Sequence, residues 1–244
     1  MKRLIIFYFL ALSATFTAAA QPYSGSLQFD GVHRTVLQGT LMGGDNIISG
    51  FFMGEGFTYT RYFGNRWSVT AGEQLQFHKQ LYSGAVSGSY RLPLGRSNNM
   101  YFDGRFLFNR YDRWSVNETI YHISAYWESP YVDIRLGGSI IHYVMIGIDS
   151  DVTDAAYTEP PAIAVGFGVN IRPRTNPWNL GLFIRNYDEY YYENWNINWG
   201  IRFYAPIIPA MKLFGEFDVR PAGSMSQLAT RYEGSLKLGL RYVL

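Results

Sequence analysis

From Ser235 to Leu244 the chain alternates strictly between apolar and polar side chains. One face of this segment carries Leu236, Leu238, Leu240, Tyr242 and Leu244, and the other carries Ser235, Lys237, Gly239, Arg241 and Val243. Strict alternation predicts a strand with one apolar and one polar face. The apolar face is the core in a soluble barrel, but it meets lipid in a membrane barrel. The rest of the sequence decides between these two.

Period-2 segments recur along the whole chain, and convincing helical periodicity is absent. We predict twelve strands, an even number as expected for a single-chain bacterial barrel. Most have at least about the 9–11 residues that a tilted strand needs to cross a bilayer. Their predicted bounds are Gly25–Gln38, Phe51–Phe63, Arg66–Gln80, Ala85–Leu92, Asn99–Tyr111, Asn117–Trp127, Tyr131–Gly147, Ala162–Arg172, Trp178–Tyr187, Asn194–Tyr204, Met211–Arg220 and Arg231–Leu244.

The connections and the aromatic residues favour a membrane barrel over a soluble one. Short turns such as Gly64-Asn65 and Glu128–Pro130 alternate with mostly longer links such as Gly39–Gly50 and Ile148–Pro161. Short periplasmic turns and longer external loops are typical of outer-membrane barrels. Aromatic side chains cluster near both ends of the strands, as two lipid–water interfaces require. Closure into a barrel also removes the exposed edges of so large a sheet.

The first twenty residues predict export. Lys2 and Arg3 precede a short apolar run and an Ala-rich site, so we expect a signal peptide to be cut before Gln21. The chain has no Cys, which excludes disulfides and a lipid-modified cysteine. Lys2 and Arg3 are 2 of 21 basic residues, so the remaining 19 balance the 19 acidic residues. A neutral mature chain argues against a nucleic-acid partner.

Taken together, the signal peptide, the cysteine-free chain and the twelve amphipathic segments resemble the outer-membrane β-barrel class. The Tyr- and Asn-rich loops and Gln21 are similar to barrels of Bacteroidota. The resemblance implies an all-β, transmembrane, antiparallel up-and-down barrel over residues 21–244, with both termini in the periplasm of a Gram-negative bacterium. One departure is that such chains often end in an aromatic residue, whereas Leu244 is terminal here.

One pair of residues suggests catalysis. His122 and Ser124 share a strand face, so the imidazole could accept a proton from the hydroxyl. The His-x-Ser pair is similar to those of outer-membrane phospholipase and lipid A deacylase, two barrel hydrolases. Asn follows the Ser in those families, whereas Ala125 follows it here, and the alternation places this pair in the lumen rather than toward lipid. A luminal hydrogen-bond network is the alternative interpretation.

The polar faces of the strands are predicted to line the lumen with charges of both signs. The expected lumen-lining residues are Asp103, Arg105, Glu118, Asp133, Arg135, Arg185, Arg202, Lys212, Glu216, Asp218, Arg220 and Arg241. Glu55 and Glu73 instead fall in rows of apolar, lipid-facing positions. Either a bulge eased by neighbouring glycines turns them inward, or another protein covers this wall.

The external loops are acidic. Asp149, Asp151 and Asp154 lie in one loop without Lys or Arg, and could hold Ca²⁺ or bridge to lipopolysaccharide phosphates. The spacing is not that of an EF-hand, so a solvated acidic loop is the alternative. No motif for a cofactor or a catalytic metal is present.

The sequence therefore predicts a non-enzymatic barrel whose surroundings are outer-membrane lipid and lipopolysaccharide. Two roles compete: an accessory subunit of an outer-membrane protein assembly, or a narrow diffusion pore with a mixed-charge lumen. Bulky luminal side chains favour the accessory role; they are Tyr101, Tyr126, Phe183, Tyr187 and Phe214. A lipid hydrolase that uses His122 and Ser124 is the third hypothesis.

Overall fold

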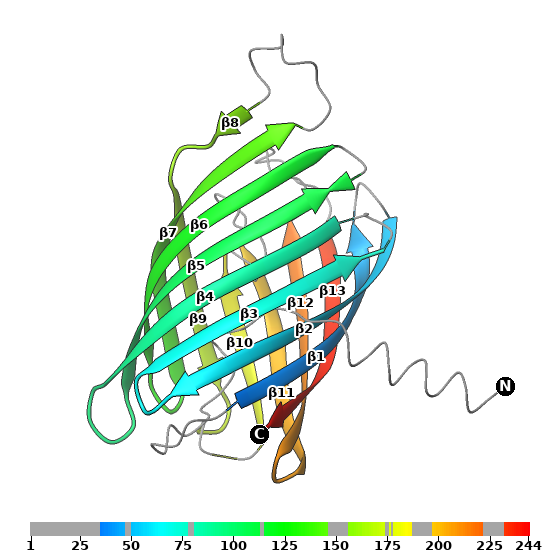
Figure 1. Cartoon of the computed structure of the whole chain (residues 1–244). Helices are drawn as coiled ribbons and strands as arrows, with labels where there is room; N and C mark the ends of the chain where they lie inside the picture. Colours follow the sequence, from blue (N-terminus) through cyan, green and yellow to red (C-terminus); the bar gives the residue numbers. More distant parts are fainter. Residues whose placement is uncertain are drawn as a thin grey trace, which may run out of the picture.

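The chain forms a closed antiparallel barrel of twelve long strands (Figure 1). The computed structural model describes residues 35–46, 50–77, 81–112, 115–145, 156–173, 176, 178–186, 197–221 and 232–244. The predicted signal peptide lies outside these residues and stays a prediction. In the described part of the chain, no helix has the length and apolar character needed to cross a bilayer.

Each long strand pairs with its neighbours in sequence, apart from the short β8. The strands are β1 (Thr35–Asn46), β2 (Gly50–Phe63), β3 (Trp67–Gln76), β4 (Leu81–Pro93), β5 (Asn99–Tyr111), β6 (Val116–Glu128), β7 (Val132–Met145), β8 (Ala156–Thr158), β9 (Ala162–Asn170), β10 (Asn179–Arg185), β11 (Asn198–Ile208), β12 (Met211–Pro221) and β13 (Tyr232–Val243). Pairing of β1 with β13 and of β6 with β7 completes the ring. The predicted twelve-stranded fold is therefore confirmed.

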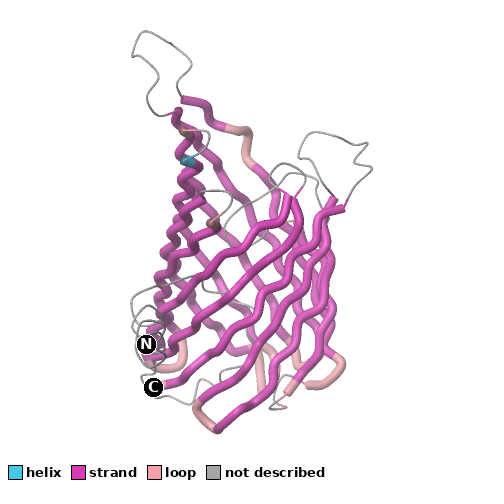
Figure 2. The backbone as a smooth tube through the Cα atoms, turned by 90° about the vertical axis from the view of Figure 1, so that its right-hand side faces the viewer, coloured by secondary structure: helices cyan, strands magenta, loops and turns pink. Residues whose placement is uncertain are grey.

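The two ends of the barrel differ. Tight turns join β2 to β3, β4 to β5, β6 to β7 and β11 to β12 at one end, which we call the tight-turn end. Gly64 (φ 61°) and Gly95 (φ 97°) occupy left-handed positions in two of these turns, where only glycine is free of strain. β1 begins at this end beside the last residue, because the Thr35 amide donates to the Leu244 carbonyl (3.3 Å). β8 extends from the opposite, long-loop end, where it pairs with β7 (Figures 1 and 2).

Side chains alternate between the two faces of the barrel wall. On β6, Ile123 is 73% exposed, whereas the neighbouring His122 is 1% exposed. On β7, Leu136 is 61% exposed and Arg135 is 1% exposed. The same alternation runs through β9 and β10, where every second residue faces outward and all of these outward residues are apolar. Apolar residues thus coat the outside and polar residues line the inside, which is the arrangement of a membrane barrel.

The first strand lies farther along the chain than the sequence indicates. The pattern predicts a strand over Gly25–Gln38 followed by a loop over Gly39–Gly50, but β1 runs from Thr35 to Asn46. Residues 25–34 lie outside the described residues. Glycines such as Gly39 and Gly43 interrupt the apolar row of β1, so its alternation is hard to recognise. Backbone pairing with both β2 and β13 holds this segment in the sheet instead.

Candidate functional site

Ion pairs between non-neighbouring strands hold the luminal face together. Arg135 of β7 reaches across β6 to Asp103 of β5 (Nη2–Oδ2 2.5 Å). Arg185 of β10 reaches across β11 to Glu216 of β12 (Nη2–Oε1 2.6 Å). The side chains of these pairs are at most 5% exposed. Charges removed from water to this degree need their partners, because an unpaired buried charge is costly.

The longest of these bridges joins Arg202 of β11 to Asp133 of β7 (Nη2–Oδ2 2.6 Å). Two strands, β9 and β10, lie between the partners. A Cβ atom at Gly168 of β9 would lie 2.5 Å from the Asp133 carboxylate and 2.8 Å from the Arg202 guanidinium. At Gly181 of β10 it would lie 3.1 Å from Arg202 Nε. The glycines therefore let the arginine lie flat along the wall.

Five further predicted lumen-lining residues also lie on inward positions. Arg105, Glu118, Asp218 and Arg241 are buried, and Lys212 is half-buried. Arg241 donates from Nε to the Oε1 of Gln38 on the neighbouring β1 (3.1 Å). The side chain of Arg220 lies outside the described residues.

Aromatic rings in the lumen pack in pairs along the wall. Tyr101 and Tyr126 stack with ring centroids 4.9 Å apart, and the Arg135 guanidinium lies 5.2 Å from the Tyr126 ring. The Arg185 guanidinium lies 4.4 Å from the ring of Phe183 on its own strand. Of the bulky residues expected in the lumen, Tyr187 lies outside the described residues. Rings and guanidinium groups therefore cover one another, which is favourable in both stacking and cation–π geometry.

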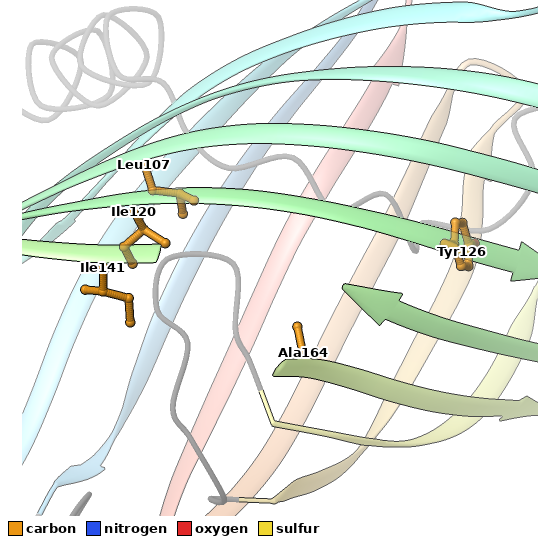
Figure 3. Packing of buried hydrophobic residues seen from close by; sticks show 5 residues of the cluster. All are labelled: Leu107, Ile120, Tyr126, Ile141 and Ala164. Atoms are coloured by element: carbon orange, nitrogen blue, oxygen red, sulfur yellow. The ribbon is translucent and has the colours of Figure 1, made fainter. Parts of the chain in front are cut away.

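A luminal apolar cluster was missed by the sequence analysis. Leu107, Ile120 and Ile141 face one another on β5, β6 and β7 and are at most 1% exposed (Figure 3). For Leu107 a sequence signal was present, because it lies in the apolar run Phe106-Leu107-Phe108. Such runs indicate strands that are buried on both faces.

His122 and Ser124, the candidate catalytic residues, are not hydrogen-bonded to each other in the described part of the chain. The His122 imidazole bonds through Nδ1 to the Ser139 hydroxyl of β7 (3.0 Å). The Ser124 hydroxyl has no hydrogen-bond partner among the described residues, and both side chains are buried in the lumen. A base must contact the hydroxyl that it deprotonates, and the substrate of a lipid hydrolase would lie outside the barrel. Both side chains face the lumen, where His122 is hydrogen-bonded to Ser139.

This geometry predicts the outcome of a simple substitution. Ser124→Ala is expected to leave phospholipid hydrolysis by the purified barrel unchanged, at the level of a protein-free control. Free fatty acid released from detergent-dispersed phospholipid measures this. Release that depends on Ser124 would restore the hydrolase hypothesis.

Glu55 and Glu73 face outward. The β1–β2 and β2–β3 ladders run without a register shift through both residues, so no bulge turns them inward. Glu55 continues a row with the exposed Met53 and Tyr59. Glu73 accepts a hydrogen bond from the Tyr82 hydroxyl of β4, another outward residue (2.8 Å). The predicted inward bulge is therefore wrong, and unbroken backbone pairing is the physical reason.

Outward glycines lie around these carboxylates. A Cβ atom at Gly39, Gly84, Gly88 or Gly104 would meet nothing within 4 Å. Gly88 pairs directly with Gly104, and Gly84 pairs with Glu73. We call this surface of β1–β5, with Glu55 and Glu73, the open-glycine wall.

Two outward glycines outside this wall, Gly215 and Gly234, lie beside neighbouring rings, whereas Gly138 of β7 does not. The Phe203 side chain lies over Gly215 of β12, and Phe217 lies 3.8 Å from a Cβ atom placed at Gly234 of β13. At the open-glycine wall, by contrast, no neighbouring side chain approaches these glycines.

The described residues contain no group of three or more metal-ligating side chains. The acidic loop residues Asp149, Asp151 and Asp154 lie outside the described residues, so the suggested cation site stays a hypothesis.

Comparison with known proteins supports the fold. No protein-family model matches the chain, and no curated protein matches it. Among solved structures, the KdgM porin in complex with disordered oligogalacturonate aligns with a TM-score of 0.55 and 9% identity, over 85% of this chain and 98% of that chain. The NanC porin aligns with a TM-score of 0.50 and 11% identity, over 85% of this chain and 98% of that chain. The chain is thus a closed twelve-stranded barrel that matches outer-membrane porins in fold.

Proposed function

We propose that this barrel is an accessory subunit that docks onto another outer-membrane protein through the open-glycine wall. The observation that carries the proposal is the juxtaposition on β1–β5 of two outward carboxylates with four uncovered glycines. Neither feature suits a surface that meets only lipid.

The free-energy cost of placing carboxylates and bare glycines against lipid favours a protein as the neighbour of this wall. A carboxylate at membrane depth costs on the order of 1–3 kcal/mol, even on lenient scales. Tyr82 offsets part of that cost for Glu73 through its hydrogen bond. The glycines provide no side chain to contact acyl tails, but small residues in membranes allow another backbone to approach closely.

The chemistry of the wall specifies the partner. It would be a membrane-spanning protein with a close-packing surface opposite Gly88 and Gly104, and with Arg, Lys or hydroxyl groups opposite Glu55 and Glu73. Such groups would form ion pairs or charge-assisted hydrogen bonds with these carboxylates, which the bilayer shields from water.

Filling the wall is expected to abolish docking without unfolding the barrel. In a Gly88→Leu/Gly104→Leu variant, the new side chains enter open space, so folding is preserved while the approach of a partner is blocked. Co-purification from native membranes in mild detergent is expected to fall at least tenfold. Gly138→Leu on β7 is the matched control, because its Cβ atom would meet only a carbonyl 3.6 Å away. Unchanged co-purification in the wall variant would contradict the proposal.

A narrow diffusion pore is the second candidate, and the charged lumen favours it. Planar-bilayer recordings of the purified barrel discriminate the two roles. Steady ion conductance together with the absence of a co-purifying protein supports the pore, whereas a silent trace with a stable partner supports the accessory role.

A further inference from the structure

The ladder between β12 and β13 contains two inward basic residues that face each other. Lys212 pairs directly with Arg241 near the tight-turn end. Farther along the same two strands, Glu216 pairs with Lys237, so opposite charges face each other there. Directly opposed residues on neighbouring strands have Cβ atoms about 5 Å apart, and like charges at this spacing destabilise a sheet. Lys212 and Arg241, which we call the basic pair, therefore need a neutralising negative charge.

The inward row that contains the basic pair supplies no such charge. Pro206 of β11 pairs with Lys212, and Gln38 of β1 pairs with Arg241. Arg241 donates from Nε to Gln38 Oε1 (3.1 Å), which is a neutral acceptor. In the part of the chain that the structure describes, neither member of the basic pair forms an ion pair with a carboxylate.

Other luminal carboxylates are held by other partners. Glu216 lies four residues from Lys212 on β12, about 13 Å along an extended strand, and contacts Arg185 (Oε1–Nη2 2.6 Å). Glu128, at the tight-turn end of β6, accepts a hydrogen bond from the Tyr126 hydroxyl (3.0 Å). Neither carboxylate is therefore free to move to the basic pair without leaving another polar group unpaired.

Two aromatic rings border the Arg241 side chain. Its guanidinium lies 5.9 Å from the centroid of the Tyr204 ring and 5.8 Å from that of the Phe214 ring. A Cβ atom at Gly239, the next inward residue of β13, would lie 2.5 Å from the Phe214 ring, so this ring lies over the glycine. Arg241 is 6% exposed, whereas Lys212 is only half-buried. The rings thus hold the guanidinium against the wall, and the lysine stays within reach of a soluble ion.

We propose that the basic pair binds a small soluble oxyanion, a phosphate or carboxylate group, inside the tight-turn end of the lumen. The guanidinium of Arg241 would donate through its planar fork, and the Lys212 ammonium would add a point charge from the neighbouring strand. A dianion such as phosphate neutralises both cations, so it binds more tightly than a monoanion such as acetate. The site faces the lumen, so it does not rest on docking through the open-glycine wall.

Isothermal titration calorimetry of the refolded full chain in uncharged detergent tests the site. Inorganic phosphate is expected to bind saturably at mildly alkaline pH, and acetate is expected to bind more weakly. Lys212→Gln is expected to weaken phosphate binding about tenfold, because a charge-assisted hydrogen bond is lost, whereas Lys212→Arg keeps the charge and retains binding.

Arg66→Gln is the matched control, because it removes one positive charge from an exposed position in the turn between β2 and β3, at the same end of the barrel. Phosphate affinity is expected to stay unchanged in this variant. The absence of saturable phosphate binding, or equal affinity of the parent and Lys212→Gln, would overturn the proposal.

Gln38→Glu provides a second, independent test. It places a carboxylate of nearly the same shape against Arg241, so the barrel supplies its own counter-ion. Phosphate affinity is expected to fall about tenfold, while resistance to unfolding by urea increases. Undiminished phosphate affinity in this folded variant would overturn the proposal, even if Lys212→Gln failed to fold, and would leave the docking proposal untouched.

Discussion

Replacement of Asp133 by Asn is expected to lower the free energy of unfolding of the barrel by about 3 kcal/mol. Asp133 is the partner of Arg202, and their side chains are only 2% and 4% exposed. The substitution keeps the size of the side chain but leaves the guanidinium charge without this counter-ion in a place that water scarcely reaches. Urea unfolding in lipid vesicles, followed by tryptophan fluorescence, measures the loss.

The double variant Asp133→Asn/Arg202→Gln separates charge from shape. Removing both charges is expected to recover most of the lost stability, because the main penalty is the unpaired charge rather than the missing contact. If the single variant lost less than about 0.5 kcal/mol, the buried character of this pair would be contradicted. If the double variant were as unstable as the single one, the loss would come from packing instead.

The inward and outward faces were predictable from the sequence, but the ion pairs were not. Alternation alone places Asp133 and Arg202 on the polar face of their strands. Their contact, however, joins residues 69 positions apart across two intervening strands. It depends on the register of three ladders and on glycines at both positions beneath the arginine, and no local pattern encodes that combination.

The outward glutamates show the limit of a local rule. Glycines next to Glu55 and Glu73 suggested a bulge, since glycine eases such irregularities. The ladders on both sides of β2 remain in register, and a bulge would sacrifice backbone hydrogen bonds that a membrane barrel must keep. Losing backbone hydrogen bonds would therefore cost more than leaving the two carboxylates on the outward face.

The luminal apolar cluster of Leu107, Ile120 and Ile141 was missed for a different reason. Alternation predicts a polar face for each strand, but Leu107 and Ile120 lie on that inward face and nothing local in the sequence links them to each other. In the fold, registration across three strands brings them together with Ile141. The apolar run around Leu107 is the one available signal in the sequence, and the residues that meet Leu107 across the neighbouring strands follow only from strand pairing.

Gly168→Val is expected to destabilise the barrel by about 3 kcal/mol, although valine is the better strand former. The new Cβ atom would lie 2.5 Å from the Asp133 carboxylate and 2.8 Å from the Arg202 guanidinium, so the bridge has to open. Gly104→Val is the matched control, because its Cβ atom would meet nothing within 4 Å. We expect that variant to stay within about 0.5 kcal/mol of the parent.

The ion pair itself supplies the deciding comparison. Suppose Gly168 is needed because the arginine lies over it. Gly168→Val introduced into Asp133→Asn/Arg202→Gln is then expected to lower the free energy of unfolding by only about 1 kcal/mol, because shorter neutral side chains can move aside. Equal losses in both backgrounds would show that the backbone of β9, rather than the bridge above it, requires glycine. Chemical unfolding of the four proteins under one set of conditions gives this coupling directly.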